Sequence, residues 1–431
     1  MATTPTSDTI PTDLGALRID GDRLIARLDE LSKVGGTERG GVTRTAFSPS
    51  DVAARELVAS WMRTAGLVTE VDAATNLIGS RAAGPHDGPM PTNLVMGSHL
   101  DTVVEGGHLD GAYGVVAAVE VATTLAEHGH RLGHGLRVVA FADEEGANGT
   151  PGMLGSQAIM GVLDPAELER HDDSDIRIAD RVLAAGGAPA QIMSAAWDAE
   201  TIAGYLELHI EQGPVLTDEG LQIGVVEAIT GRRIVEVLLT GSSNHAGTTP
   251  MHLRQDAMSA AAEVILAVEQ LALDGLVRVA TCGHIKASPN VRNVVAGHVA
   301  LGLDIRDVDN ERIDAAVAVL RERVVPIAER RSVQIELIDG QGVTAMPCDD
   351  GLVGDVTRAA ELLSLPSMRM PSGAGHDAQV VARGAPIAMV FVPRRNGLSH
   401  NPDEYTEPAA LISGANVLLQ ALLAADERLD R

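Results

Sequence analysis

The chain has few of the features that serve a nucleic acid or a membrane. Its 33 lysines and arginines are outnumbered by 59 aspartates and glutamates, and the formal net charge is -26. A nucleic acid or an anionic lipid surface is bound by a basic face, which this composition lacks. No apolar run approaches the roughly 20 residues that a membrane-spanning helix needs. We therefore expect neither a nucleic acid nor a membrane as a partner.

Cysteine and aromatic residues are also scarce. The two cysteines, Cys282 and Cys348, are far apart and show no C-x-x-C spacing. This argues against a disulfide framework and a thiolate zinc site, and it fits a reducing, cytoplasmic compartment. Aromatic residues make up 2% of the chain, so the core must rest on aliphatic side chains. Residues Met1 to Asp13 have no basic and no apolar segment, which predicts a solvated tail and not a signal peptide.

The length of the chain predicts two domains, because 431 residues exceed what one typical core holds. Helical and strand-like patterns alternate through the first half and again near the C-terminus, which is typical of an α/β fold. The helices are predicted at 19–34, 50–65 (with Ser50 or Asp51 as N-cap), 114–128, 351–363 and 408–425, and the strands at 67–72, 76–80, 93–100, 135–142, 333–337 and 387–392, with a Gly/Pro turn over 82–91.

The pattern changes around Pro214. Strand-like runs at 223–228, 233–240, 277–286 and 299–307 and helical runs at 256–272 and 311–330 follow. Four strands and two helices predict an α+β insertion with an antiparallel sheet. We expect a catalytic domain over 1–213 and 331–431, interrupted by a lid or dimerisation domain over 214–330. The exposed edge that such a sheet offers favours a homodimer.

The first chemical motif follows a buried strand. His99 ends the run, Asp101 stands two residues later, and Asp110 opens an apolar helix. An acidic residue at the spacing of Asp101 can hold the second imidazole nitrogen of His99 and fix its tautomer, as partners of metal-bound histidines do. Asp110 can bridge two cations from the start of the helix. For His99 taken alone, a histidine satisfied within the core or a loop is the alternative.

Acidic residues also end the next strand. Asp143, Glu144 and Glu145 are followed by a glycine, and adjacent carboxylates repel each other unless a cation or a proton lies near. We interpret Glu145 as a metal ligand and Glu144 as the general base, which takes a proton from the attacking water and passes it to the leaving nitrogen. A solvated acidic turn is the alternative in so acidic a chain.

Two more histidines lie near strand ends, His209 in L-H-I-E-Q-G-P and His400 in G-L-S-H-N-P. With His99, Asp110 and Glu145 they supply three imidazoles and two carboxylates, a ligand mixture that suits Zn²⁺, Mn²⁺ and similar ions. If Asp110 bridges, one ion takes His99, Asp110 and His209, and the other takes Asp110, Glu145 and His400. An open position then remains for water and substrate.

The ordered motifs resemble those of one family. The segments G-S-H-L-D-T-V, G-G-x-L-D-G-x-Y-G-V, D-E-E-G, L-H-I-E-Q-G-P-V-L, N-H-A-G-T-T-P-M, S-P-N-x-x-N-V-V, L-D-I-R, S-G-A-G-H-D-A and G-L-S-H-N-P occur in this order, within roughly residues 20–425. They are similar to the dinuclear amidohydrolases that include N-carbamoyl-L-amino-acid hydrolases, β-ureidopropionases and allantoate amidohydrolases, within the aminoacylase and carboxypeptidase-like clan of metallopeptidases. The resemblance implies a metallopeptidase-like catalytic domain with a mixed β-sheet between helices. It also implies two divalent ions per subunit (Zn²⁺, Mn²⁺, Co²⁺ or Ni²⁺).

The resemblance further implies contacts with a small-molecule amide substrate that carries a carboxylate. Gln212 would hold the ureido or amide group, and His245 would reach a neighbouring active site across a dimer and stabilise the tetrahedral oxyanion. Asn290 and Arg306 match positions that grip the carboxylate, Arg306 through a bidentate pair. A surface charge is the alternative for Arg306.

A glycine-rich loop completes the implied substrate contacts. The segment from Gly373 through Gly375 to Asp377 resembles a loop that offers backbone amides to the substrate. For His376, beside Asp377, the alternative is a residue that stabilises a turn.

One departure from the family pattern concerns the substrate. Relatives usually follow E-E-G with x-R-F, whereas here Gly146 is followed by A-N-G-T-P-G-M, without an arginine or a phenylalanine. The loop starts at Glu145, so losing a cation and an aromatic ring there should reshape substrate choice and leave the metal chemistry intact.

The leading hypothesis is hydrolysis of an N-carbamoyl-L-amino acid to the amino acid, CO2 and ammonia, with Glu144, Asp101 and His245 as catalytic residues. An allantoate amidohydrolase, or an amidase for another N-acyl or peptide-like amide, is the alternative. A catalytically silent binding protein is the third hypothesis, but it predicts a missing ligand or base, and all six positions are filled.

Overall fold

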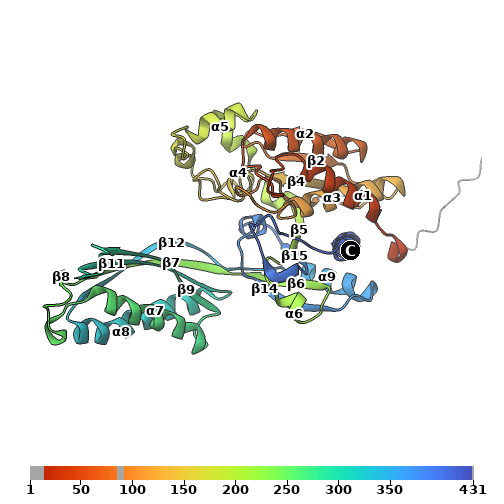
Figure 1. Ribbon diagram of the computed structural model, residues 1–431. Coiled ribbons are helices and arrows are strands. Elements are labelled where there is room, and N and C mark those ends of the chain that lie inside the picture. Colours follow the sequence, from red (N-terminus) through yellow and green to blue (C-terminus); the bar gives the residue numbers. More distant parts are fainter. Residues whose placement is uncertain (1–13, 85–91, 430–431) are drawn as a thin grey trace, which may run out of the picture. The chain divides into compact units, whose positions relative to one another are not determined.

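The computed structural model describes residues 14–84 and 92–429. The predicted tail, 1–13, and most of the predicted turn over 82–91 lie outside the described residues. The chain forms two compact units, described separately below (Figure 1). The larger unit comprises Met1–Glu227, Cys348–Met370 and His376–Arg431, and the smaller unit comprises Ala228–Pro347 and Pro371–Gly375.

A mixed sheet forms the centre of the larger unit, with the strand order β1-β2-β4-β3-β5-β15-β6. Neighbours among β4, β3, β5 and β15 run parallel, whereas β1, β2 and β6 run antiparallel to their neighbours. The strands are β1 Val68–Val71, β2 Leu77–Arg81, β3 Asn93–His99, β4 Gly135–Phe141, β5 Ile202–Ile210, β6 Ile223–Ile229 and β15 Ile387–Val392; β6 and β14 (Ser367–Ser372) lead into the smaller unit. The carboxyl ends of the four parallel strands therefore meet at one edge, where α/β proteins place their sites.

The helices of the larger unit match the predicted ones closely. They are α1 Gly21–Ser32, α2 Pro49–Thr64, α3 Ala112–Glu127, α9 Asp350–Leu362 and α11 Pro408–Leu429, with the short helices α4 Leu154–Ile159, α5 Ile178–Ala184, α6 Val215–Asp218 and α10 Asp377–Val381. The predicted N-cap of α2, Ser50 or Asp51, was wrong. Ser48 caps this helix and accepts a hydrogen bond from the Asp51 amide, because Pro49 fits the first helical position, where no amide hydrogen is needed.

Two apolar helices build most of this core. α3 is buried from Ala112 to Leu125 and packs against β3 and β5, and α11 packs against α3, α9, β5 and β15. By length and composition alone α11 could cross a membrane, so it is more apolar than we expected of any run in the chain. Its most apolar window is 67% buried inside the protein, which is the packing of a core helix.

A four-stranded antiparallel sheet forms the smaller unit, with the order β12-β7-β11-β9. The helices α7 and α8 cover one face of it (Figure 1). The elements are β7 Gly231–Thr240, α7 Ala257–Leu273, β9 Val279–Ser288, β11 His298–Asp307, α8 Asn310–Arg331 and β12 Gln334–Val343, with the short strands β8 Asn244–His245, β10 Val294–Val295 and β13 Met346–Pro347. The architecture agrees with the predicted α+β insertion of four strands and two helices.

The membership of two strands differs from the prediction. The run 223–228, predicted in the inserted sheet, is β6 of the mixed sheet, and the run 333–337, predicted in the larger domain, lies in β12 of the smaller sheet. Periodicity shows that a run is extended but cannot show which sheet it joins. The units accordingly divide after Glu227 and Pro347, later in the chain than the predicted boundaries at 213 and 330.

Candidate metal centre

All five predicted ligands lie at the carboxyl edge of the mixed sheet. They are His99 at the end of β3, Asp110 before α3, Glu145 after β4, His209 near the end of β5 and His400 in the segment after β15. Their ligand atoms form two groups, His99 with Asp110 and His209, and Asp110 with Glu145 and His400, within 4.8 Å of one another in each group. We call the first group the buried half-site and the second the exposed half-site. Asp110 belongs to both.

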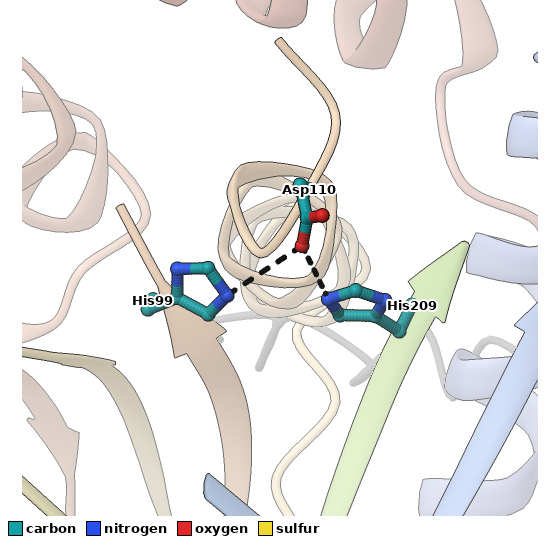
Figure 2. Close-up of side chains that lie close together, drawn as sticks. All are labelled: His99, Asp110 and His209. Carbon is teal, nitrogen blue, oxygen red and sulfur yellow. Dashed lines mark ion pairs between the residues drawn. The ribbon is translucent and has the colours of Figure 1, made fainter. Parts of the chain in front are cut away.

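The buried half-site is organised around one carboxylate oxygen (Figure 2). Asp110 Oδ1 lies 3.1 Å from Nε2 of His209 and 3.8 Å from Nε2 of His99. Nδ1 of His209 donates to the Ile210 carbonyl at 2.8 Å, and Nδ1 of His99 donates to the Asp101 carbonyl at 3.0 Å. Because a carbonyl oxygen only accepts, Nδ1 carries a proton in both rings. Nε2 is therefore the atom through which each histidine would bind a cation.

Asp101 orients its neighbours differently from the prediction. We expected its side chain to hold His99, but its main-chain carbonyl does so, and the carboxylate Oδ1 lies 3.8 Å from the ring. The carboxylate instead accepts from the amides of Glu144 at 3.3 Å and Glu145 at 3.2 Å. Burial raises the pKa of Asp101 to about 6, against the lowering effect of these amides. Asp101 thus fixes the main chain that carries the predicted base and a predicted ligand.

The exposed half-site uses the other oxygen of Asp110. Nε2 of His400 lies 3.6 Å from Asp110 Oδ2 and 3.3 Å from Glu145 Oε2. The His400 side chain is 48% exposed, compared with 2% for His99 and 1% for His209. The two oxygens of Asp110 therefore face different histidines, which is the geometry that a bridging carboxylate requires.

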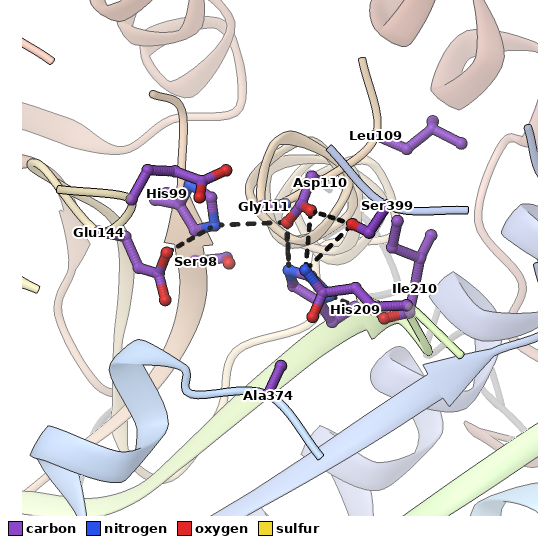
Figure 3. A network of polar contacts seen from close by, with 12 residues as sticks. Ser98, His99, Leu109, Asp110, Gly111, Glu144, His209, Ile210, Ala374 and Ser399 are labelled. Carbon is purple, nitrogen blue, oxygen red and sulfur yellow. Dashed lines mark hydrogen bonds and ion pairs between the residues drawn. The ribbon is translucent and has the colours of Figure 1, made fainter. Parts of the chain in front are cut away.

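Two polar side chains hold the second oxygen of Asp110, and Figure 3 labels one of them, Ser399. Asp110 Oδ2 accepts from Ser399 Oγ at 2.9 Å and from Gln212 Nε2 at 2.8 Å. The side-chain oxygen Oε1 of Gln212 is buried and has no hydrogen-bond partner in the described part of the chain. Gln212, predicted to bind the substrate amide, thus contacts a predicted ligand as well. We had not predicted a role for Ser399, although it precedes His400 in the G-L-S-H-N-P motif.

A glycine at the start of α3 makes room for the buried half-site. Gly111 has a φ of +62°, and a Cβ atom there would lie 2.3 Å from Nε2 of His99. Both the positive φ and the close approach exclude larger residues. The glycine of the L-D-G motif therefore lets His99 and Asp110 approach one another.

The buried carboxylates of the site require a positive charge nearby. Burial and the nearby Asp110 raise the pKa of Glu145 to about 10, and burial and Glu145 raise the pKa of Glu144 well above its usual range. Glu145 Oε1 is also buried, and it has no hydrogen-bond partner among residues 14–84 and 92–429. Crowded, buried carboxylates are costly unless a positive charge neutralises them. The residues therefore fit divalent cations.

The two buried histidines differ in their protonation. Burial lowers the pKa of His99 to about 4. Burial also acts to lower the pKa of His209, but the hydrogen bond to Asp110 and the charge of that group prevail and raise it to about 9. Burial acts to raise the pKa of Asp110, but the hydrogen bond from His209 and the charges of His209, His99 and His400 together lower it well below its usual range.

A buried carboxylate that we had not predicted supports the two strands beside the site. Glu207 accepts from Ser98 Oγ at 2.7 Å and from the Ala378 amide at 3.1 Å. The ring of His376 packs against that of His209 with the centroids 4.7 Å apart. His376 stands at the N-cap position of α10. The sequence could have indicated that Glu207 lies near the site, since Glu207 precedes His209 by two positions on the same strand.

The remaining predicted residues belong to the smaller unit. His245 is exposed in β8, and its Nδ1 accepts from the amides of Gly247 at 3.1 Å and Thr248 at 3.3 Å. An accepting Nδ1 leaves the ring proton on Nε2, so His245 offers Nε2–H as a donor. Asn290 is exposed and has a φ of +54°.

Arg306 is held from two sides within the smaller unit. Its Nε and Nη2 donate to the two carboxylate oxygens of Asp304 at 2.7 and 2.8 Å, and its Nη1 donates to the Gly373 carbonyl at 2.8 Å. The bonds to Asp304 raise the pKa of Arg306, which keeps the guanidinium charged. Gly375 lies in the same unit.

A sequence profile of the peptidase family M20/M25/M40 matches residues 95–424. The chain belongs to this family. It is 41% identical over 400 residues to an N-carbamoyl-L-amino acid amidohydrolase of Geobacillus stearothermophilus, covering 93% of this chain and 97% of that one. It is 35% identical over 416 residues to allantoate deiminase 1 of Glycine max, covering 89% of this chain and 85% of that one.

A solved structure gives the same result. The hydantoinase/carbamoylase family amidase of Burkholderia multivorans superposes with a TM-score of 0.88 at 36% identity, covering 95% of this chain and 98% of that one. These matches confirm the predicted family, the α/β fold with a smaller antiparallel sheet, and the assignment to hydrolases of C–N bonds. The family and the two half-sites indicate the use of divalent metal ions.

Proposed function

We propose that the chain hydrolyses N-carbamoyl-L-amino acids to the amino acid, CO2 and ammonia, with two divalent ions per subunit. The observation that carries this proposal is the shared carboxylate of Asp110, whose two oxygens face separate sets of ligands. The relative in Geobacillus stearothermophilus, named as an N-carbamoyl-L-amino acid amidohydrolase, supports the substrate class. The five nitrogen and oxygen ligands suit Zn²⁺, Mn²⁺, Co²⁺ or Ni²⁺.

Glu144 is the proposed general base. When bound, divalent ions polarise the substrate carbonyl and lower the pKa of water. Glu144 follows β4, and its Oε2 lies 3.6 Å from Nε2 of His99. Its pKa is raised by burial and by Glu145, so it can hold the proton taken from the attacking water and deliver it to the leaving nitrogen. The Asp101 carboxylate keeps the Glu144 main chain in place.

Gln212, in the larger unit, would hold the ureido or amide group, and the other proposed substrate contacts are residues of the smaller unit. His245 presents Nε2–H, a donor suited to the oxyanion of a tetrahedral intermediate. Arg306 would bind the substrate carboxylate through one N–H on each terminal nitrogen, because Asp304 takes Nε and one N–H of Nη2, and the Gly373 carbonyl takes one N–H of Nη1. Asn290 would grip the same carboxylate, and Gly373 and Gly375 would offer backbone amides.

We propose a cytoplasmic homodimer in which His245 acts in the active site of the partner. Support comes from the edge strand β9, which leaves Val279 and Ile285 each 51% exposed, as a strand available for pairing would. The absence of a disulfide between Cys282 and Cys348, both free thiols, supports a reducing compartment.

Hydrolysis of allantoate is the second candidate. The segment after Glu145 lacks the arginine and phenylalanine of the family pattern, and Asn148 uses its side-chain amide to hold the Ala46 carbonyl at 2.7 Å. The absence of a cation and an aromatic ring beside the predicted ligand Glu145 would change which substrates the site accepts. The relative in Glycine max is named an allantoate deiminase.

Ammonia release from a substrate panel tests the proposal. The Mn²⁺- or Zn²⁺-loaded protein is given N-carbamoyl-L-amino acids, N-carbamoyl-β-alanine, allantoate, and N-acetyl or dipeptide amides, with amine release read in parallel. We expect turnover on the N-carbamoyl-L-amino acids. Turnover on allantoate or acyl amides alone would reject the carbamoyl substrate and keep the amidohydrolase.

A matched pair of variants tests the base. Glu144→Gln should lower turnover by about 10²–10⁴-fold, because general-base catalysis contributes about that much, and should keep the metal content of the parent. Glu200→Gln, at an exposed position, is the control and should change neither. Near-normal activity of the Glu144 variant would reject the assignment of the base.

A further inference from the structure

A buried carboxylate with no part in the proposed chemistry lies directly behind the bridging ligand. Glu404 Oε1 accepts from the amide of Leu109 at 2.8 Å and from the amide of Asp110 at 3.1 Å. The Glu404 side chain is 0% exposed. The main chain that presents Asp110 is therefore held by a residue 294 positions later in the sequence.

The turn before Asp110 is shaped around this carboxylate. A Cβ atom on Gly107 would lie 2.0 Å from the carboxyl carbon of Glu404 and 2.2 and 2.3 Å from its oxygens. Such distances are far inside van der Waals contact, so only glycine fits while Glu404 keeps its place. Gly107, the first glycine of the G-x-L-D-G segment, thus leaves room for the Glu404 side chain, and Gly111 leaves room for the His99 ring.

Arg394 is the charge partner of Glu404. Both side chains are 0% exposed, and Arg394 Nη2 lies 3.7 Å from Glu404 Oε2. Thr217 Oγ1 donates to the main-chain carbonyl of Arg394 at 2.7 Å, which anchors the arginine. The charged groups that interact with Glu404 include Arg394, Asp110 and Glu145. The arginine therefore lets a second carboxylate stay buried next to the bridging one.

We propose that Glu404, paired with Arg394, is a positioning residue for Asp110, and that it strengthens cation binding in both half-sites. It does so by fixing the two amides that set the direction of the Asp110 side chain, and by adding negative charge behind the site. The inference rests on the proposed function, since it requires metal ions at Asp110. Partners of metal ligands commonly contribute about 10–100-fold to metal affinity.

Metal affinity and the stability of the metal-free protein together test this role. The dissociation constants for Mn²⁺ and Zn²⁺ are measured by competition with a chromophoric chelator, for the parent, Glu404→Gln and Glu407→Gln. The control residue Glu407 lies in the same segment, and its side chain is 64% exposed. We expect about 10–100-fold weaker binding for Glu404→Gln and no change for Glu407→Gln.

Thermal unfolding of the metal-free protein separates positioning from simple support of the fold. Glutamine keeps an oxygen that can accept from both amides, but it leaves the buried guanidinium of Arg394 without its charge partner. We therefore expect metal-free Glu404→Gln to melt lower than the parent, and the metal affinity measured alongside decides between the two roles. A lower melting temperature with unchanged metal affinity would overturn the inference and leave Glu404 a purely structural residue.

A second variant keeps the negative charge at position 404 and shortens the side chain that carries it. Glu404→Asp is shorter by one methylene, so we expect its metal affinity to lie between those of the parent and Glu404→Gln. Equal affinity of all three proteins would overturn the inference and leave the proposed function intact. Failure of the parent itself to bind Mn²⁺ or Zn²⁺ would overturn the inference and the proposed function together.

Discussion

The two half-sites share Asp110 and differ in nearly everything else. In the buried half-site, His99 and His209 are almost fully buried, and a main-chain carbonyl fixes each ring. In the exposed half-site, His400 stands in a loop with its side chain 48% exposed. The difference teaches that, of the two proposed ions, one would be held by a buried, preorganised set of ligands and the other by a more accessible set. We therefore expect the buried half-site to bind its ion more tightly and to exchange it more slowly.

Removal of the shared ligand should have the largest effect, because it breaks both halves at once. Asp110→Asn removes the negative charge that the histidines of both half-sites face. We expect loss of both ions by elemental analysis after dialysis, and no detectable turnover. Asp403→Asn, at an exposed position nearby in the sequence, is the control. Retention of one tightly bound ion in the Asp110 variant would show that the halves do not share this ligand.

Substitution of one histidine in each half-site should distinguish the metal affinities of the two half-sites. His209→Asn should lose the tightly bound ion and weaken the other, whereas His400→Asn should keep the tight ion and lose only the weak one. Calorimetric titration of the metal-free variants with Mn²⁺ measures both affinities. Identical titration curves for the two variants would refute the comparison, because burial would then have no bearing on affinity.

The space beside His99 offers a test that affects mainly the buried half. Gly111→Ala places a Cβ atom 2.3 Å from the His99 ring at a φ of +62°. We expect weaker binding of the tight ion and a loss of unfolding free energy above about 1 kcal/mol. Gly129→Ala is the matched control, since Gly129 has a φ of +63° and no atom within 4 Å. It should lose stability in chemical denaturation without any change in metal affinity.

The smallest expected effect belongs to the hydrogen bond from Ser399. Ser399→Ala removes one of the two donors to Asp110 Oδ2 and leaves Gln212 in place. A single hydrogen bond contributes about 0.5–1.5 kcal/mol, so the weaker ion should bind only several-fold less tightly. Competition with a chelator measures this change. A loss as large as that of His400→Asn would mean that Ser399 acts as more than a donor to the carboxylate.

The grouping of the predicted ligand residues could be expected, because strand ends and helix starts are visible in a sequence pattern. His99 and His209 lie at the ends of apolar runs, and Asp110 precedes an apolar helix. In a parallel sheet such positions converge at one edge whatever the details of packing. The prediction therefore needed only the order of strands and helices.

The supporting residues could not be predicted in the same way. Glu404 and Ser399 act on Asp110 from nearly 300 positions away, and no periodicity connects such distant segments. The choice between the side chain and the main chain of Asp101 as partner of His99 depends on a backbone conformation that the residue types leave open. The sequence likewise could not show which sheet β6 and β12 join, because the pattern of each run shows only that it is extended.

The sequence by itself determined the α/β class, the inserted sheet with two helices, and the chemistry of the ligands. These follow from local periodicity and from the donor atoms of each residue type. Only the tertiary structure decided which oxygen of Asp110 faces which histidine, how deeply each half-site is buried, and which carboxylates support it. Burial and hydrogen bonding between distant segments depend on packing in three dimensions, and they set the pKa of each group and the difference between the halves.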